Sequence, residues 1–297
     1  MMLRARLFAA LVCCAAIPLG PVHAQAERPV RAAQQNALDL AVNAYRNKDF
    51  AEARVQAQRA ADAGAAEGAT LMALLQERGL GGPVNEAEAV RFYRIAAQQN
   101  EPDALIGLGR LGAARRGGAT PAEALGALQR AIAANREDAA APLADLLLSG
   151  AAGVRDPAAG SSLYQRAARG GDADAAYAAA ILLNDADPSA PDDLPAARAL
   201  LKQAADAGRA DANADYGLML YQGAGGPRDL PEAARRFRAA AEKGDLDGAF
   251  YWALVTARGE GAPRDLAEAR RWAEKARGSS PDADRLHEAL SRAPVAP

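Results

Sequence analysis

Cysteine and histidine are almost absent from this chain of 297 residues. It has two cysteines, the adjacent Cys13 and Cys14, and two histidines, His23 and His287. The chain beyond residue 24 therefore offers no thiolate for zinc, no disulfide and a single imidazole. A Ser-His-Asp triad would have His287 as its base, and no nucleophile motif accompanies that residue. We expect no metal site, no cofactor and no hydrolytic triad.

Aromatic residues are also scarce, at 5% of the chain, although half of the residues are hydrophobic. Most of the apolar content is alanine, and alternation of Val, Ile and Thr is missing. The helix propensity of Ala, Leu, Arg and Glu predicts an all-α protein. Charge of neither sign dominates, because 35 Lys and Arg residues face 37 Asp and Glu residues. This balance argues against nucleic acid as a partner.

The N-terminus has the features of an export signal. Arg4 and Arg6 precede an apolar run over residues 7–17, and small residues form a cleavage site near Ala24 or Ala26. The run is too short to span a membrane. The residues before the cysteine pair fit a lipoprotein cleavage site poorly. We expect an exported protein of the periplasm, or a secreted one, without a lipid anchor or stable membrane insertion.

Residues that favour helix N-caps recur every 35 to 37 residues. Five of these seven positions are followed three residues later by Glu, which predicts a reciprocal capping box at each of the five. A fixed period of this size is the mark of a repeat solenoid. The predicted caps are Asp49, Asn85, Thr120, Asp156, Asp193, Asp229 and Asp265.

Small residues recur at fixed distances from each cap. The position eleven after the cap is alanine in every copy, and positions four and eight lie on the same helical face, which we expect to be buried. Each first helix should end at Gly64, Asn100, Asn135, Gly171, Gly208 or Gly244, which tolerate the left-handed conformation. A second helix follows, with small residues four and nine beyond the stop, and the pair predicts an αα-hairpin.

These positions together resemble the Sel-one-like repeat family, a relative of the tetratricopeptide repeats. One copy carries the family pattern in Asp229, Ala233, Arg236-Phe237, Ala240-Ala241, Gly244, Gly259 and Gly261, and Leu108-Gly109 supplies the Leu-Gly dipeptide of an earlier copy. The resemblance implies a right-handed superhelix of about six two-helix repeats of ~36 residues with terminal capping helices. The expected segments are a signal peptide (1–24), a linker with a capping helix at 33–47 (25–48), the repeats (49–278), and a capping helix at 281–292 with a tail (279–297).

Two connections depart from the repeat pattern, at residues 112–119 and 185–192. Both are rich in turn-forming or flexible residues, so we expect altered stacking angles there.

The remaining polar motifs favour structure over catalysis. The closing glycine pairs follow helices and not strands, so they lack the context of a phosphate-binding loop. The recurring glutamates are accounted for as helix caps. Some cysteine-rich members of the family are associated with β-lactam hydrolysis, but this sequence lacks their paired cysteines. We therefore expect a protein that is not an enzyme, and a β-lactam or glycan hydrolase is the third and least favoured hypothesis.

The candidate binding residues come from the outer face of the first helices. If these helices line the concave side, as the resemblance implies, positions six and nine after each cap face away from the apolar stripe. A ladder of amides and guanidinium groups there suits an extended peptide, or an acidic polysaccharide bound through bidentate pairs. The alternative is a solvated helix face with i,i+4 charge pairs. The candidates are Arg91, Arg94, Gln129, Gln165, Lys202, Arg235, Arg238 and Arg271.

The sequence thus favours a periplasmic scaffold or adaptor that binds an extended or helical segment of a protein partner. The second hypothesis is a binding component in exopolysaccharide export or cell-wall assembly that recognises an anionic glycan or peptidoglycan. Salt-sensitive binding of a glycan would distinguish the second from the first.

Overall fold

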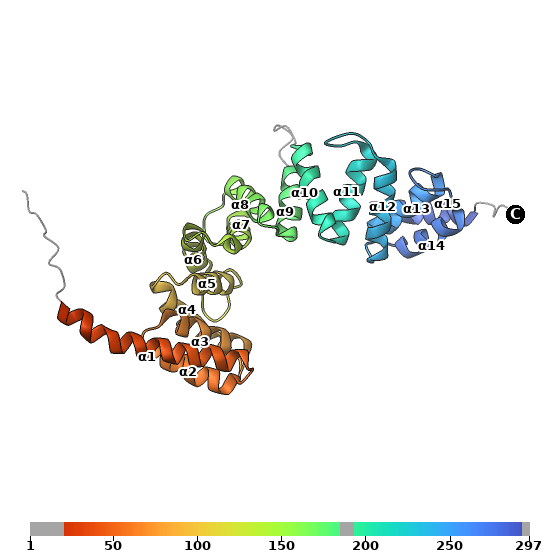
Figure 1. The fold of residues 1–297 in the computed structure, drawn as a ribbon. Helices are drawn as coiled ribbons and strands as arrows, with labels where there is room; N and C mark the ends of the chain where they lie inside the picture. Colours follow the sequence, from red (N-terminus) through yellow and green to blue (C-terminus); the bar gives the residue numbers. More distant parts are fainter. Residues whose placement is uncertain (1–20, 185–192, 293–297) are drawn as a thin grey trace, which may run out of the picture. The chain divides into compact units, whose positions relative to one another are not determined.

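The computed structural model describes residues 21–184 and 193–292, and it divides into two compact units, Met1–Glu101 and Pro102–Pro297 (Figure 1). The described ranges contain fifteen α-helices, one short 3-10 helix and no strand, which confirms the all-α class. Residues 1–20, which hold most of the predicted export signal, and the connection at 185–192 lie outside the described residues. Each unit is described by itself below.

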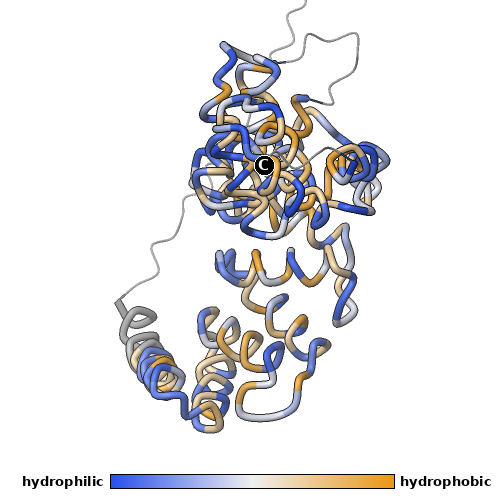
Figure 2. Tube along the Cα trace, turned by 90° about the vertical axis from the view of Figure 1, so that its right-hand side faces the viewer, coloured by the Kyte–Doolittle hydropathy of each residue, from blue (hydrophilic) through white to orange (hydrophobic). Residues whose placement is uncertain are grey.

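Consecutive helices form the expected hairpins, and neighbouring helices pack against each other within each unit. Figure 2 shows apolar and polar residues interleaved along the helices, as expected when each helix buries one face. The first unit contains α1 (Pro21–Arg46), α2 (Phe50–Asp62), α3 (Ala66–Arg78) and α4 (Glu86–Gln98). The second contains α5 (Pro102–Ala113), α6 (Pro121–Ala133), the 3-10 helix η1 (Glu137–Ala139), α7 (Ala140–Ser149), α8 (Pro157–Arg169), α9 (Ala173–Asn184), α10 (Leu194–Asp206), α11 (Ala210–Gln222), α12 (Leu230–Glu242), α13 (Leu246–Arg258), α14 (Leu266–Ala276) and α15 (Pro281–Arg292).

All seven predicted N-caps are confirmed, since each side chain accepts a hydrogen bond from the backbone N–H three residues on. The prediction of five reciprocal capping boxes is wrong at four of the five caps, because the glutamate side chain does not accept a hydrogen bond from the cap N–H there. Among the described helices the box is recorded at Thr120, whose backbone N–H donates to Glu123 Oε2 at 2.9 Å. Elsewhere the cap N–H donates to the preceding helix instead, as Asp229 does to the Leu220 carbonyl at 3.0 Å. The N3 glutamates of those repeats are thereby free for other contacts.

The alanine stripe is buried as predicted. The position eleven after each cap is at most 5% exposed in every copy. Opposite it lies the small residue at the start of the second helix, and a Cβ added at Gly68 would stand 2.5 Å from the Ala60 Cβ. The next contact joins adjacent repeats, because Gly217 of α11 lies directly against the ring of Phe237 in α12. The seven alanines are Ala60, Ala96, Ala131, Ala167, Ala204, Ala240 and Ala276.

Left-handed backbone ends each first helix at the residues expected, with φ between 58° and 98°. In three repeats, the second glycine of the closing pair also packs against the first turn of that repeat, at Gly81, Gly225 and Gly261. Gly261 has φ 78°, and a Cβ there would overlap the carbonyl of Leu230 at the start of α12. The turn therefore closes against the first turn of its own repeat, and only glycine fits there.

The ends of the array agree with prediction in part. The C-terminal capping helix is α15, with the expected bounds. The N-terminal capping helix was expected at residues 33–47, but α1 begins twelve residues earlier, at Pro21. The predicted cleavage positions, Ala24 and Ala26, therefore lie within α1. Pro29 favours a helix start after it, which is why the sequence pattern places the beginning of the helix near residue 33, but α1 continues upstream through this proline.

The division between units falls after Glu101, whereas the expected joints were at 112–119 and 185–192. At the first of these, Gly112 packs tightly against the Thr120 carbonyl and the Ala124 Cβ, so α5 and α6 stay in close contact. Residues 185–192 lie outside the described part of the chain.

Candidate functional site

The predicted binding residues lie on the first helices, but they differ in exposure. Six are exposed: Arg91, Gln129, Lys202, Arg235, Arg238 and Arg271. Arg94 and Gln165 are half-buried. Arg91 and Arg94 belong to the first unit and the other six to the second. The structure therefore describes two separate sets of candidates.

Several of the cationic candidates pair with an acidic residue of their own helix. Arg91 contacts Glu88 Oε2 at 2.8 Å, and its guanidinium stands 4.3 Å from the centroid of the Phe92 ring. Lys202 Nζ contacts Asp206 Oδ2 at 2.6 Å, an i,i+4 pair. These are the helix-face charge pairs that formed the alternative interpretation. Binding by this face remains a prediction.

The same pairing holds for the two arginines of α12. Arg235 is paired with Glu232, and Arg238 Nε donates to Glu242 Oε1 at 2.8 Å. The Arg238 guanidinium also stands 5.8 Å from the Trp252 ring. Trp252 itself is buried, and its indole N–H donates to Glu268 at 3.2 Å.

Sequence reasoning missed a set of contacts that join the second helices of adjacent repeats. The Tyr177 hydroxyl of α9 donates to Asp215 Oδ2 of α11 at 3.0 Å. Burial raises the pKa of Tyr177, and the Asp215 carboxylate raises it further. Burial also raises the pKa of Asp215, against the opposing effect of the tyrosine bond, and the nearby Asp211, Asp245 and Asp247 carboxylates add to the rise. The sequence feature that could have indicated this contact is the placement of Tyr177 six residues after Gly171 and of Asp215 seven residues after Gly208, the glycines that end the preceding helices.

Arginines strengthen these junctions. Arg209 pairs with Asp174 of the preceding repeat and with Asp211 of its own, and its guanidinium stands 4.6 Å from the Tyr177 ring. Hydrogen bonds to Asp211 and Asp174 outweigh burial and raise the pKa of Arg209. Such contacts fix the angle between repeats, because a planar guanidinium needs both partners in place.

Arg236 of α12 links the fifth and sixth repeats. Its side chain is 18% exposed, and Nη2 contacts Asp206 Oδ1 at 2.7 Å while Nε contacts Glu232 at 2.6 Å. The pKa of Asp206 is lowered, first by its hydrogen bond to Lys202 and then by Arg236. Arg236 was not among the candidate residues, and the structure shows it inside a junction.

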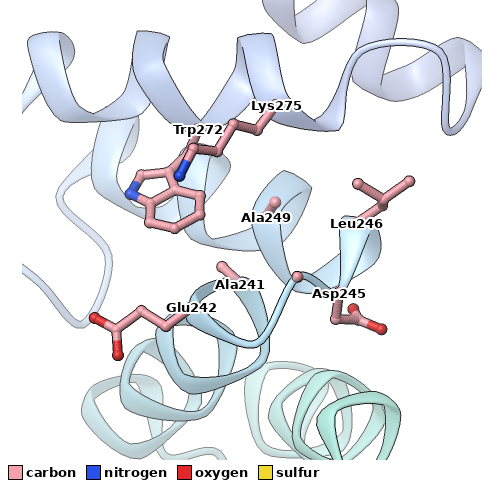
Figure 3. Close-up of a pocket in the computed structure, with 8 residues that line it drawn as sticks. Ala241, Glu242, Asp245, Leu246, Ala249, Trp272 and Lys275 are labelled. Carbon is pink, nitrogen blue, oxygen red and sulfur yellow. The ribbon is translucent and has the colours of Figure 1, made fainter.

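A pocket of about 220 Å³ lies at the next junction, between the α12–α13 turn and α14 (Figure 3). Ala241 and Ala249 form its floor, and Trp272 and Lys275 of α14 lie across from them. The Lys275 ammonium stands 3.8 Å from the centroid of the Trp272 ring. Glu242, Gly244, Asp245 and Leu246 complete the lining.

The described residues hold no cluster of three or more His, Cys, Asp or Glu side chains that would suit a metal ion. Across these same residues, no helix has the length and apolar character needed to cross a bilayer. His287 is half-buried, with Nδ1 3.2 Å from Glu274, and the Ser291 hydroxyl donates to the backbone carbonyl of His287 and not to its ring. This arrangement gives no nucleophile–base pair.

Comparison with known proteins agrees with the repeat pattern. The family model described as Sel1 repeat matches residues 66–101, 138–172, 173–208, 210–245 and 246–277, which together exceed half of the chain. Each match begins at or near a second helix and continues into the first helix of the next repeat. The unmatched stretch between the first two matches contains α5, α6 and the irregular connection at 112–119. No curated protein sequence matched the chain.

Two solved structures show a similar fold. The crystal structure of c5321, a protective antigen present in uropathogenic Escherichia coli strains and displaying an SLR fold, aligns with 87% of this chain at a TM-score of 0.72 and 22% identity. This chain spans 57% of the length of that structure. A Sel1 repeat protein from Oxalobacter formigenes aligns with 81% of this chain and 96% of its own length, at a TM-score of 0.64 and 21% identity.

The Sel1 repeat fold serves in general as a scaffold for protein–protein interaction, and its members are generally not catalytic. The repeat period, the buried alanine stripe, the family-model matches and the two structural relatives agree, and the chain belongs to the Sel1 repeat family.

Proposed function

We propose that this protein is an exported adaptor of the periplasm that holds a protein partner on the exposed face of its first helices. The observation that carries the proposal is the repeated register of that face. Gln129, Lys202 and Arg238 occupy the same position, nine after the cap, on α6, α10 and α12, and all three are exposed. The large buried residues of these helices, Leu128, Leu201 and Phe237, lie in the core and not on this face.

The charge pairs on this face are compatible with binding. Arg235 and Arg238 are 68% and 57% exposed, and each pairs with an acid of its own helix. Exposed pairs of this kind contribute about 0–1 kcal/mol each. A partner's carboxylate can therefore replace the helix's own acid at little cost.

The same pairing favours a protein over an anionic glycan. Glu232 and Glu242 lie beside the two arginines, and they would repel a polymer of uniform negative charge. A protein segment can offer acidic, amide and basic groups in alternation and satisfy both signs. Binding of an anionic polysaccharide that is lost at high salt would overturn this preference.

The test is capture of a partner by a variant that loses both charges. In Arg235→Gln with Arg238→Gln, the amides cannot clash with Glu232 and Glu242 as reversed charges would. The matched control is Arg285→Gln with Arg292→Gln on α15, because these arginines are also exposed and pair with acids three and four residues away. We expect partner capture from a periplasmic extract to fall with the first variant and not with the second. Equal capture by both variants would remove the proposed surface.

Export is tested separately. The N-terminal residue of the protein recovered from the periplasmic fraction should follow Ala24 or Ala26. Recovery of the chain in the cytoplasm with residues 1–24 intact would contradict this part of the proposal.

A further inference from the structure

At the junction between the fifth and sixth repeats, the end of a hairpin receives two cationic side chains from the following repeat. Asp206, at the end of α10, is contacted by Arg236 of the next repeat at 2.7 Å. Two residues on, the Gly208 carbonyl accepts a hydrogen bond from Lys243 of that same repeat. The carboxylate and the carbonyl thus both receive cations from the following module.

The next junction repeats the acceptors without the donors. Glu242 and Gly244 occupy the positions of Asp206 and Gly208 one period later. The positions equivalent to Arg236 and Lys243 hold Trp272 and Ser279, which carry no charge. A Cβ added at Gly244 would meet nothing within 4 Å, so the space beside this residue is open.

The 220 Å³ pocket opens where the donors are missing (Figure 3). Its floor is formed by Ala241 and Ala249, and Leu246 at its edge is 48% exposed. Ala249 replaces Asn213, which contacts Arg236 in the preceding junction. The pocket therefore combines an apolar floor with the acidic residue Glu242 and with Gly244 in its lining.

The Trp272 ring adds an affinity for positive charge. Lys275 Nζ already lies over this ring, 3.8 Å from the centroid. An indole face attracts ammonium and guanidinium groups, and the attraction grows when they are desolvated. Glu242 keeps one contact, to Arg238 of its own helix, as Asp206 does to Lys202.

We propose that this pocket receives an arginine or lysine side chain of a partner protein, in place of the cation that the next repeat supplies at the preceding junction. The inference rests on the proposed scaffold function and specifies one contact of it. The aliphatic stem of the partner's side chain would lie on Leu246 and Trp272. Its charged head would reach the Glu242 carboxylate and the Gly244 carbonyl, which are the acceptor types used by Arg236 and Lys243.

The experiment uses the two tryptophans of the whole chain as reporters. The peptide acetyl-Gly-Arg-Gly-amide is titrated while the two indole N–H signals are followed by NMR, with Trp252→Phe to assign them. Trp252 is 6% exposed and bonded to Glu268, so its signal serves as the internal reference. We expect a saturable shift of the Trp272 signal alone, and none with acetyl-Gly-Gln-Gly-amide.

Two substitutions fix the sign of the ligand charge. Glu242→Gln should weaken binding of the arginine peptide at least fivefold, while Glu67→Gln, the same change at an exposed site on α3, should leave it unaltered. Lys275→Gln removes a competing cation, so binding should become tighter. If Lys275→Gln instead abolishes binding and an acidic peptide shifts Trp272, the pocket takes anions and the proposal is wrong.

The remaining outcomes separate this proposal from the adaptor function. A Trp272 shift with no protein captured from cells would support the pocket and reject the adaptor. Partner capture that survives Glu242→Gln, together with no peptide shift, would reject the pocket and keep the adaptor. A fall in molecular mass on Glu242→Gln would show that a second copy of the chain occupies the pocket, and it would overturn the assignment to a partner protein.

Discussion

Gly217→Ala sets two physical effects against each other at one position. Gly217 lies in the middle of α11, where alanine is preferred over glycine by about 1 kcal/mol. The structure opposes this gain, because an added Cβ would stand 2.8 Å from both Cδ1 and Cε1 of Phe237. Phe237 is fully buried and its ring stacks on Tyr251 with centroids 4.9 Å apart, so it has little room to move.

Overpacking of a filled core costs about 1–3 kcal/mol, which exceeds the propensity gain over most of that range. We therefore expect Gly217→Ala to lower the free energy of unfolding by up to about 2 kcal/mol. Gly126 is the matched control, because it lies inside α6 and an added Cβ would meet nothing within 4 Å. Gly126→Ala should raise stability by about 0.5–1 kcal/mol.

Urea denaturation compares the two variants, and hydrogen exchange locates the effect. Repeat arrays can unfold in parts, so the exchange rates of α11 to α13 are the more direct measure. Adding Phe237→Leu to Gly217→Ala should restore stability, since Ala180 and Leu201 already occupy the equivalent positions one repeat earlier. The packing argument is refuted if Gly217→Ala and Gly126→Ala stabilise the protein equally.

Two further predictions concern a buried acid and a closing turn. The pKa of Asp215 is raised above 3.8 in the folded protein, so folding favours the protonated acid. The free energy of unfolding therefore falls as the pH rises from about 4 through the raised pKa. Asp215→Asn, which keeps an acceptor for Tyr177, should be more stable than the natural protein at pH 7, with the gap closing towards pH 4; a gap independent of pH would contradict this. Gly261→Ala should lower the unfolding free energy by more than about 2 kcal/mol, because strain from φ 78° is joined by overlap with the Leu230 carbonyl. Gly278→Ala, at φ 84° in open space, isolates the strain, and an equal loss in the two variants would remove the steric contribution.

The fold was largely predictable because the same constraint recurs in each repeat. The burial of Ala60 and its equivalents, the caps such as Asp229, and the left-handed stops such as Asn100 each follow from residue type and spacing. A single copy would have given a weak signal, but concurrence at seven copies did not depend on any one residue.

The capping boxes show where local reasoning failed. A Glu three after the cap suits a box, but whether it forms depends on where the cap N–H donates. At Asp229 and Asp265 that N–H reaches back to the preceding helix, which is a contact across about nine residues that the local motif does not contain. At Thr120 the irregular connection prevents this, and the box forms.

The candidate site was less predictable than the fold. The exposed register of Gln129 and Lys202 followed from helical periodicity, but the pairing of Arg236 across repeats did not. Arg236 lies beside the buried alanine stripe, and its contact depends on which residue the preceding repeat places opposite it, here Asp206. The pocket at Trp272 arises in the same way, because it needs both the acceptors of one repeat and the missing donors of the next.

Site-specific photo-crosslinking in living cells tests the central claim most directly. A photoreactive amino acid replaces Gln129, Lys202 or Arg271 on the first-helix face, or Arg285 on α15 as the control. The account predicts a covalent adduct with another protein from the first three positions and none from Arg285. Absence of any protein adduct from the first-helix face, or equal adducts from all four positions, would contradict it.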